Sequence, residues 1–160
     1  MAKVSASILA CDHTRIGEQV LEAEKAGADI ITFQLDACPN PIHMLREVRK
    51  SGLKAGIGIG SAYDVENMKY LLHHIDGLIL MSVEPGYGGQ PFEKSIYEKL
   101  RRVREIMEET GKYVPVSIDG GVNAATGRKL VDAGADVLIA GSSVFQAASI
   151  TEAIRTLKAL

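Results

Sequence analysis

The chain has 160 residues, of which 46% are hydrophobic and 24% are charged, a composition typical of one globular domain and unlike that of a disordered chain. Its 18 basic and 20 acidic residues give a formal net charge of -2, so we expect no nucleic-acid partner and no anionic membrane surface. Apolar runs of about four residues fall far short of the ~20 that cross a bilayer. We therefore expect residues 1–160 to form a single domain with no membrane partner.

The two cysteines, Cys11 and Cys38, lack the spacing of a redox or metal motif. The residues before Lys3 also lack the charged and apolar regions of a signal peptide. Both observations favour a reducing compartment, and we expect a cytoplasmic protein.

Short β-branched or apolar runs alternate along the chain with amphipathic stretches of about ten to eighteen residues. This alternation is typical of parallel strands joined by crossover helices. The expected strands are 4–9, 29–35, 53–59, 77–83, 114–118 and 137–140, each followed by a helix.

Glycine is expected to end several of these helices, because it adopts the left-handed conformation of a helix C-cap. Residues 26–29 and 133–136 both read Ala-Gly-Ala-Asp, so Gly27 and Gly134 mark equivalent helix-to-strand joints. Gly52 and Gly111 have the same place after the second and fourth helices. The chain therefore resembles one βα unit used repeatedly.

A parallel sheet of this kind is covered by helices either as an open doubly wound sheet or as a closed barrel, and the pattern alone does not choose between them. In both architectures ligands bind where the strands end and the βα loops gather. Chemistry is therefore expected at the C-terminal strand ends.

The last two strands each end in glycine. Asp119, Gly120 and Gly121 follow one strand, and Gly141 and Ser142 follow the next. Glycines let backbone N–H groups approach an anion, and the following helix presents its positive end. Paired loops of this type form the phosphate site of many barrels, although each alone could be only a tight turn.

A third glycine-rich segment, residues 81–90, reads Met-Ser-Val-Glu-Pro-Gly-Tyr-Gly-Gly-Gln. A long βα loop of this composition could close over a substrate, or could be an ordinary surface loop. Together with residues 5–12, 119–123 and 140–143, this segment resembles the signatures of the ribulose-phosphate 3-epimerase family. The resemblance covers essentially the whole chain.

The resemblance implies a (βα) barrel of eight units that interconverts ribulose 5-phosphate and xylulose 5-phosphate by moving a proton at C3. Two aspartates and a divalent metal, zinc or iron, serve that reaction in the family. By this resemblance Asp119 is a catalytic acid/base and metal ligand, Ser7 lies beside the substrate, and Met81 is an apolar wall. The residues expected to bind the phosphate are Gly88, Gly89, Gly120, Gly121, Gly141 and Ser142.

The chain departs from the family pattern in the region of the metal. The family's second and third βα units, which supply three of its four metal ligands, have no counterpart, and the segment after the first helix resembles the family's fourth strand. Gln34 and Asp36 stand where the family usually has His and Glu, and Gly60-Ser61 replaces an Asn-Pro pair. Asp36 either replaces the lost carboxylate or is a solvated strand-end acid. The four histidines are expected at the surface or at helix ends: His13, His43, His73 and His74.

The expected fold is thus an α/β repeat derived from the TIM barrel, with about six parallel strands in a shortened barrel or a partly open sheet. Because exposed strand edges invite pairing, we expect a homo-oligomer. The first functional hypothesis is an epimerase acting on a sugar phosphate. The second is a truncated or engineered barrel that binds sugar phosphate or inorganic phosphate without turnover. A lyase or synthase of a related barrel family would need a lysine constellation that the strand ends lack.

Overall fold

A computed structural model describes residues 5–7, 14–86 and 90–160. The strands are β1 (Ser5–Ser7), β2 (Ile30–Gln34), β3 (Lys54–Ile59), β4 (Gly77–Met81), β5 (Val116–Asp119) and β6 (Val137–Ile139). The α-helices are α1 (Ile16–Lys25), α2 (Pro41–Lys50), α3 (Met68–Leu71), α4 (Ile96–Thr110), α5 (Ala124–Asp132), α6 (Ser142–Phe145) and α7 (Ile150–Lys158). Two 3-10 helices, η2 (Leu35–Ala37) and η3 (Leu72–His74), complete the described elements.

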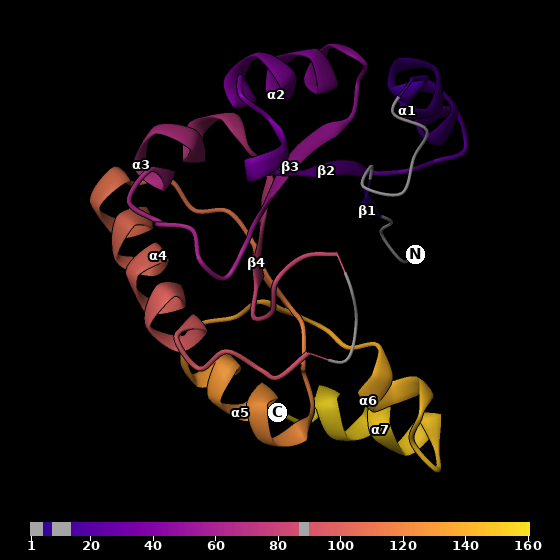
Figure 1. The fold of residues 1–160 in the computed structure, drawn as a ribbon, viewed down its shortest axis with the longest axis vertical. Helices are drawn as coiled ribbons and strands as arrows, with labels where there is room; N and C mark the ends of the chain where they lie inside the picture. Colours follow the sequence, from indigo (N-terminus) through magenta and orange to yellow (C-terminus); the bar gives the residue numbers. More distant parts are fainter. Residues whose placement is uncertain (1–4, 8–13, 87–89) are drawn as a thin grey trace.

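The six strands form one parallel sheet in the order β1-β2-β3-β4-β5-β6 (Figure 1). Each predicted strand is present, and the prediction of a barrel-derived α/β repeat is confirmed. The order runs along the chain without the reversal that defines a doubly wound sheet, so the arrangement is that of a barrel. Within the described residues β1 pairs only with β2 and β6 only with β5, so the sheet is open.

The outer face of the sheet carries the hydrophobic core. Side chains alternate between the two faces of a strand, and on β3 the outward residues Ala55, Ile57 and Ile59 are at most 1% exposed. They belong to one buried cluster with Leu45 of α2 and Leu100 of α4. Figure 1 shows these helices ranged along the outer side of the arc of strands. Burial of this apolar face is the main term that stabilises the fold.

The inner face of the sheet is lined by small and polar residues. Gly56 and Gly58 of β3 pair in register with Thr32 and Gln34 of β2. A Cβ on Gly56 would lie 2.7 Å from Thr32 Oγ1, and one on Gly58 would lie 2.7 Å from the Gln34 amide. The side chains of β2 therefore lie across β3, which is why β3 has glycine on this face.

The predicted helix ends are confirmed at both Ala-Gly-Ala-Asp joints. Gly27 lies just after α1 with φ +95°, and Gly134 lies just after α5 with φ +105°. Both values are in the left-handed region that ends a helix. Glycine is required at both positions because other residues resist this conformation.

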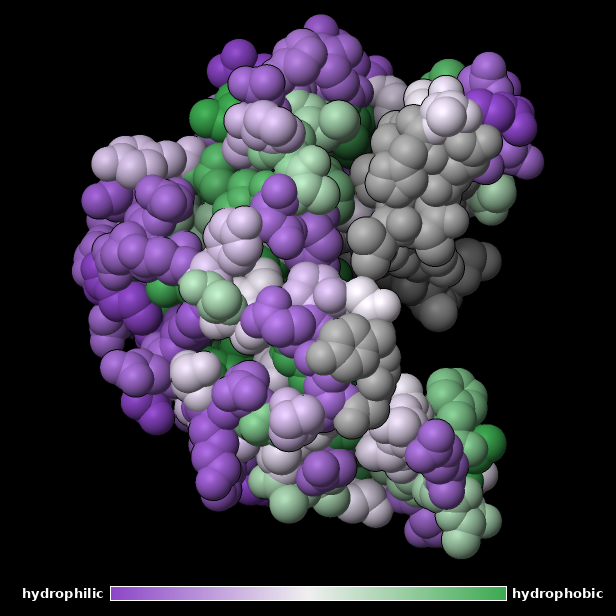
Figure 2. Space-filling model, viewed as in Figure 1, coloured by the Kyte–Doolittle hydropathy of each residue, from purple (hydrophilic) through white to green (hydrophobic). Residues whose placement is uncertain are grey.

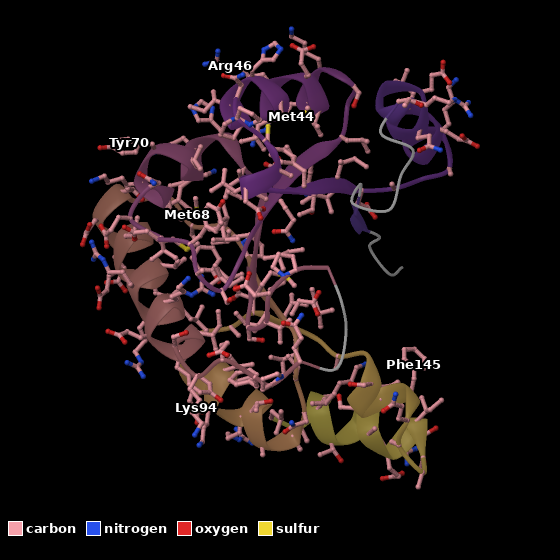
Figure 3. The ribbon with its side chains drawn as sticks, viewed as in Figure 1. Met44, Arg46, Met68, Tyr70, Lys94 and Phe145 are labelled. Atoms are coloured by element: carbon pink, nitrogen blue, oxygen red, sulfur yellow. The ribbon has the colours of Figure 1, made fainter. Side chains whose placement is uncertain are left out.

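Apolar side chains are exposed at the end of the sheet formed by β6, α6 and α7. Val137 is 46% exposed, Phe145 74%, Ile150 45% and Ile154 41%. Figure 2 shows apolar surface over α6 and α7, and Figure 3 shows Phe145 projecting outward from α6. We call these four residues the β6-edge surface. Among the helices of the described ranges, none is both long and apolar enough for a membrane span.

Candidate functional site

Asp119 is the last residue of β5 and lies at the C-terminal end of the sheet. Its register partners are Met81 of β4 and Ile139 of β6. Because register partners in a parallel sheet point to the same face, the three side chains belong to the inner face. Met81 is only 9% exposed. The structure therefore places the predicted acid/base beside the residue predicted to be an apolar wall.

The surroundings of Asp119 favour the protonated form of its side chain. The carboxyl is half-buried, and this burial raises its pKa above the ordinary aspartate value. A hydrogen bond from the Gly120 backbone acts in the opposite direction but is the smaller effect. A carboxyl whose pKa moves toward neutral pH is better suited to exchange protons with a substrate.

The Gly120-Gly121 turn that follows Asp119 is packed tightly under the β4–α4 loop. Gly120 has φ +108°, and a Cβ there would lie 2.6 Å from Val83 Cγ2. Gly121 has φ +55°, and a Cβ there would lie 3.1 Å from Phe92 Cβ. Both glycines are thus needed by the backbone and by packing, whatever ligand the turn binds.

Gly141 has different surroundings. It precedes α6 with φ -98°, a value open to any residue. No described heavy atom outside its own chain neighbours lies within 4 Å of the position that a Cβ would take. Packing within the described residues therefore does not require glycine at this position.

The two glycine-ended loops are joined by a hydrogen bond. Ser143 Oγ donates to the backbone oxygen of Val122 at 2.5 Å, which brings the start of α6 against the loop after β5. The N-terminus of α5 is less available to an anion, because Asn123 Oδ1 already accepts from the backbone N–H groups of Ala125 and Thr126. An anion at this place would therefore meet the glycine turn and the first residues of α6.

The remaining predicted site residues are only partly placed. Ser7 ends β1 and pairs in register with Thr32, while its side chain lies outside the described residues. Gly88 and Gly89 also lie outside the described residues. Asp36 is exposed on η2, as expected of a solvated acid, and among the histidines His43 and His73 are exposed on α2 and η3.

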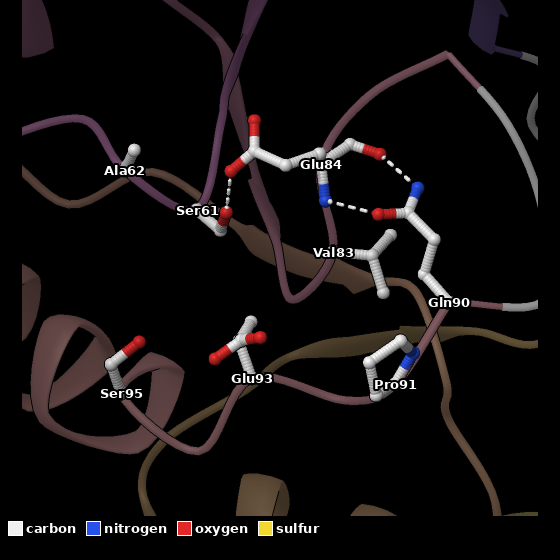
Figure 4. A pocket seen from close by; sticks show the side chains of 8 residues that line it. All are labelled: Ser61, Ala62, Val83, Glu84, Gln90, Pro91, Glu93 and Ser95. Carbon is white, nitrogen blue, oxygen red and sulfur yellow. Dashed lines mark hydrogen bonds between the residues drawn. The ribbon is translucent and has the colours of Figure 1, made fainter.

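A cavity of about 270 Å³ lies beside the site, between the loop after β3 and the loop after β4 (Figure 4). Its lining consists of Ser61, Ala62, Val83, Glu84, Gln90, Pro91, Glu93 and Ser95, and includes none of the predicted site residues. Ser61 Oγ donates to the Glu84 carboxylate, and Gln90 bonds both the N–H and the oxygen of the Glu84 backbone. Two carboxylates on its wall, those of Glu84 and Glu93, disfavour a phosphate there.

The described residues do not fit the divalent metal that the family resemblance implies. The described ranges contain no group of three histidine, cysteine, aspartate or glutamate side chains that could hold a metal ion. At the strand ends the partners of Asp119 are Met81 and Ile139, neither of which supplies an oxygen or imidazole ligand.

Two serines were missed by the sequence reasoning. Ser143 could have been found from its place directly after the predicted phosphate residues Gly141 and Ser142. Ser82 gave no such signal, because it lies within an apolar strand end and its partners are 37 and 38 residues away.

The sequence pattern of the Ribulose-phosphate 3 epimerase family matches residues 20–145. Ribulose-phosphate 3-epimerase of Mycobacterium leprae is 39% identical over 134 residues, which are 84% of this chain and 60% of that protein. The enzyme of the same name from Bacillus subtilis is 34% identical over 135 residues, covering 84% of this chain and 62% of that protein. The chain thus spans about 60% of the length of these relatives.

The fold is also similar to that of a solved structure, the crystal structure of a 3-hexulose-6-phosphate synthase. The two superpose with a TM-score of 0.69 at 21% identity, covering 98% of this chain and 72% of that one. At this identity the likeness concerns the fold alone. The family pattern, by contrast, extends over most of the sequence and over both glycine-ended loops, and the chain belongs to the ribulose-phosphate 3-epimerase family.

Proposed function

We propose that this protein binds a pentulose phosphate and interconverts ribulose 5-phosphate and xylulose 5-phosphate by proton transfer at C3, with Asp119 as an acid/base. The observation that carries the proposal is the position of Asp119, which stands on the inner face next to Met81 and directly before the glycine turn. Membership of the family supports the same reaction.

The phosphate of the substrate would lie between the two loops that Ser143 joins. Gly120, Gly121, Gly141 and Ser142 are the proposed contacts there, and Gly88 and Gly89 are proposed from the family resemblance. Backbone N–H groups can bind phosphate without a charged side chain. Ser7 is proposed to lie beside the sugar.

The proton transfer follows from the ketone chemistry of the substrate. The Asp119 carboxylate would take the proton from C3, and the electron pair of the C3–H bond would move into an enediolate with the C2 carbonyl. Return of a proton to the opposite face of C3 gives the epimer, whereas return by Asp119 to the same face regenerates the substrate. Epimerisation therefore needs a second proton donor, and water could fill that role.

A second candidate function is phosphate binding without turnover. It is favoured by the register partners of Asp119, because neither Met81 nor Ile139 can donate a proton from the other face of a substrate. Loss of one acid/base group typically costs a factor of ~10² to 10⁴ in rate.

The experiment that separates these functions follows C3 of ribulose 5-phosphate by NMR in D₂O. The epimerase proposal expects deuterium at C3 together with xylulose 5-phosphate, and neither with Asp119→Asn. Deuterium without xylulose 5-phosphate would show that Asp119 acts alone on one face. No deuterium, together with measurable phosphate binding, would support the binding function and overturn the enzyme.

We also propose that residues 1–160 act as one ribulose-phosphate-binding domain, that the protein is cytoplasmic, and that it forms a homo-oligomer. Cysteine usage supports the location, since Cys11 and Cys38 lack the spacing of a redox or metal motif. The unpaired edges of β1 and β6 in the described sheet support the oligomer.

A further inference from the structure

Ser82 is an unusual residue at the junction of the site. It follows the last residue of β4 and is fully buried, and Thr32 is the only other polar residue that is buried in the described ranges. Buried polar groups are costly unless they are hydrogen-bonded, so the contacts of Ser82 indicate what it does.

The contacts of Ser82 all lead to the proposed phosphate turn and to the loop above it. Its backbone N–H donates to the oxygen of Asp119 at 2.8 Å. Its hydroxyl shares its one proton between the oxygen of Asp119 at 2.9 Å and that of Gly120 at 2.5 Å. Its own backbone oxygen accepts from the N–H of Glu93 at 2.8 Å. One residue thus connects the end of β5, the glycine turn and the β4–α4 loop.

These bonds set the direction of two backbone N–H groups. In a trans peptide the N–H points away from the C=O of the same unit, and the described chain has no cis peptide. The oxygens of Asp119 and Gly120 both point toward Ser82, so the N–H groups of Gly120 and Gly121 are turned away from it. The N–H of Gly120 meets the Asp119 carboxylate on that side. The N–H of Gly121 is then the group of this turn that is directed toward a phosphate.

We propose that Ser82 is a positioning residue whose hydroxyl holds the Asp119-Gly120-Gly121 turn with its N–H groups directed toward a phosphate and toward the Asp119 carboxylate. Ser82 itself touches no substrate. The proposal rests on the proposed phosphate site, and it adds that the β4 strand end, rather than the turn alone, determines the geometry of that site. The bond from Glu93 makes the β4–α4 loop part of the same unit.

The test compares three full-length proteins: wild type, Ser82→Ala and Ser82→Thr. Thr110→Val is the matched control, because the Thr110 hydroxyl is also shared between two backbone oxygens, those of Ile106 and Met107, at the far end of α4. Amide spectra of the ligand-free proteins report the Gly120 and Gly121 N–H groups, and titration with inorganic phosphate gives a dissociation constant. If Ser82→Ala fails to fold, Ser82→Cys keeps the volume with only a weak donor.

We expect Ser82→Ala to shift the Gly120 and Gly121 amide signals and to weaken phosphate binding by roughly five- to tenfold, since one hydrogen bond is lost. Ser82→Thr should restore both, and Thr110→Val should change neither. Unchanged glycine signals in Ser82→Ala, or equal weakening in Thr110→Val, would overturn the proposal. If wild type does not bind phosphate, the proposed function fails, while the ligand-free spectra still decide whether Ser82 sets the turn.

Discussion

Gly120 and Gly141 are both proposed phosphate contacts, yet glycine is present at the two positions for different reasons. At Gly120 a side chain would collide with Val83 and the backbone is left-handed, so substitution disturbs the protein itself. At Gly141 a side chain would meet no described atom within 4 Å, and the φ of -98° is not in the left-handed region. Only Gly141 therefore separates ligand binding from folding.

We expect Gly141→Ala to leave the free energy of unfolding within about 0.5 kcal/mol of wild type and to weaken phosphate binding by roughly tenfold. The added methyl group would occupy the space through which a phosphate reaches the backbone. Urea unfolding and a calorimetric phosphate titration measure the two quantities. Gly17→Ala on α1, where a Cβ also meets nothing within 4 Å, is the control. Unchanged affinity in Gly141→Ala would remove Gly141 from the site.

Asp119 shows a conflict between chemistry and stability at a single residue. Burial raises the pKa of the Asp119 carboxyl in the folded protein above its value in the unfolded chain. A carboxyl of this kind stabilises the fold fully below the unfolded pKa, and that contribution is lost as the pH rises through the folded pKa. At neutral pH the charged form of Asp119 therefore lowers the free energy of unfolding, and the proposed proton transfer would explain why an aspartate is present here.

Asp119→Asn is expected to be more stable than wild type at neutral pH, by about 1 kcal/mol, because the amide has no charge to desolvate. The difference should grow as the pH rises from the unfolded pKa through the raised folded pKa of Asp119, and nearly vanish below both. Urea midpoints measured across this range test the prediction. A variant that is less stable than wild type at neutral pH would contradict it.

The sequence predicted those site residues whose position depends on the local pattern. Asp119 was expected where a strand ends and is found there, since the apolar run before it and the glycines after it define where that strand stops. Met81 was expected inside the strand 77–83 and is instead the last residue of β4. Ser82 and Ser143 were not predicted, because their partners lie 37 and 21 residues away in sequence. Such contacts depend on which strands are neighbours, and periodicity does not contain that information.

At the scale of elements, two aspartates stabilise the end of the sheet opposite the site. Asp76 precedes β4 and accepts from the N–H of Ala55 on β3 at 3.0 Å and from Arg49 of α2 at 2.8 Å. Asp136 precedes β6 and accepts from the N–H of Val116 on β5 at 2.7 Å and from Arg104 of α4 at 2.6 Å. Each aspartate thus connects the preceding strand of the sheet with the helix that comes before that strand in the chain. In barrels, residues at this N-terminal end of the strands contribute to stability.

Asp136→Asn is expected to lower the free energy of unfolding by about 1–3 kcal/mol, because it weakens charge-assisted hydrogen bonds in a partly buried place. Burial alone would raise the Asp136 pKa, but the Tyr113 hydroxyl, the Val116 N–H and Arg104 together lower it. The stabilisation is thus present above the unfolded pKa and is lost as the pH falls through the folded pKa. Urea unfolding at several pH values measures both effects.

The control for this prediction is Asp132→Asn, which changes an exposed aspartate on α5. It should alter stability by less than about 0.5 kcal/mol. Equal losses in the two variants, or a loss in Asp136→Asn that persists unchanged below the folded pKa, would show that the contacts of Asp136 do not provide the stabilisation.

The repeat pattern predicted helix-to-strand joints correctly but underestimated the last βα unit. One helix was expected after β6, and the structure has two, α6 and α7. The second begins because Ser149 caps it, its side chain accepting from the N–H of Glu152 at 3.3 Å. Capping signals of this kind are visible in the sequence, but a helix of four residues such as α6 is too short to give a period.

For the whole molecule, the sequence pattern does not predict whether the sheet closes into a barrel. Strand number and tilt are linked in a barrel, and six strands would enclose a very narrow interior. The structure is an open arc, with α1 and β1 at one end and α6 and α7 at the other (Figure 1). The alternation of side chains could predict the strands, but whether the first and last strands meet depends on geometry accumulated over the whole sheet.

The open arc leaves the β6-edge surface beside a strand edge that pairs with nothing in the described ranges. The opposite end of the same sheet has the edge of β1, which is parallel to β6 and also unpaired there. A second copy of the chain therefore offers a matching edge. Apolar surface next to a strand edge is typically covered by another protein surface.

We expect wild type to associate as its concentration rises, and Phe145→Ser to weaken that association by roughly tenfold, since an exposed aromatic side chain is the kind of residue that dominates such interfaces. Phe145 is 74% exposed, so its loss should leave the fold intact. Analytical ultracentrifugation over a concentration series measures the effect. Tyr70→Ser is the control, because Tyr70 is 63% exposed on α3, away from the β6-edge surface (Figure 3). A wild-type monomer at every concentration, or equal effects of the two substitutions, would exclude self-association through this edge.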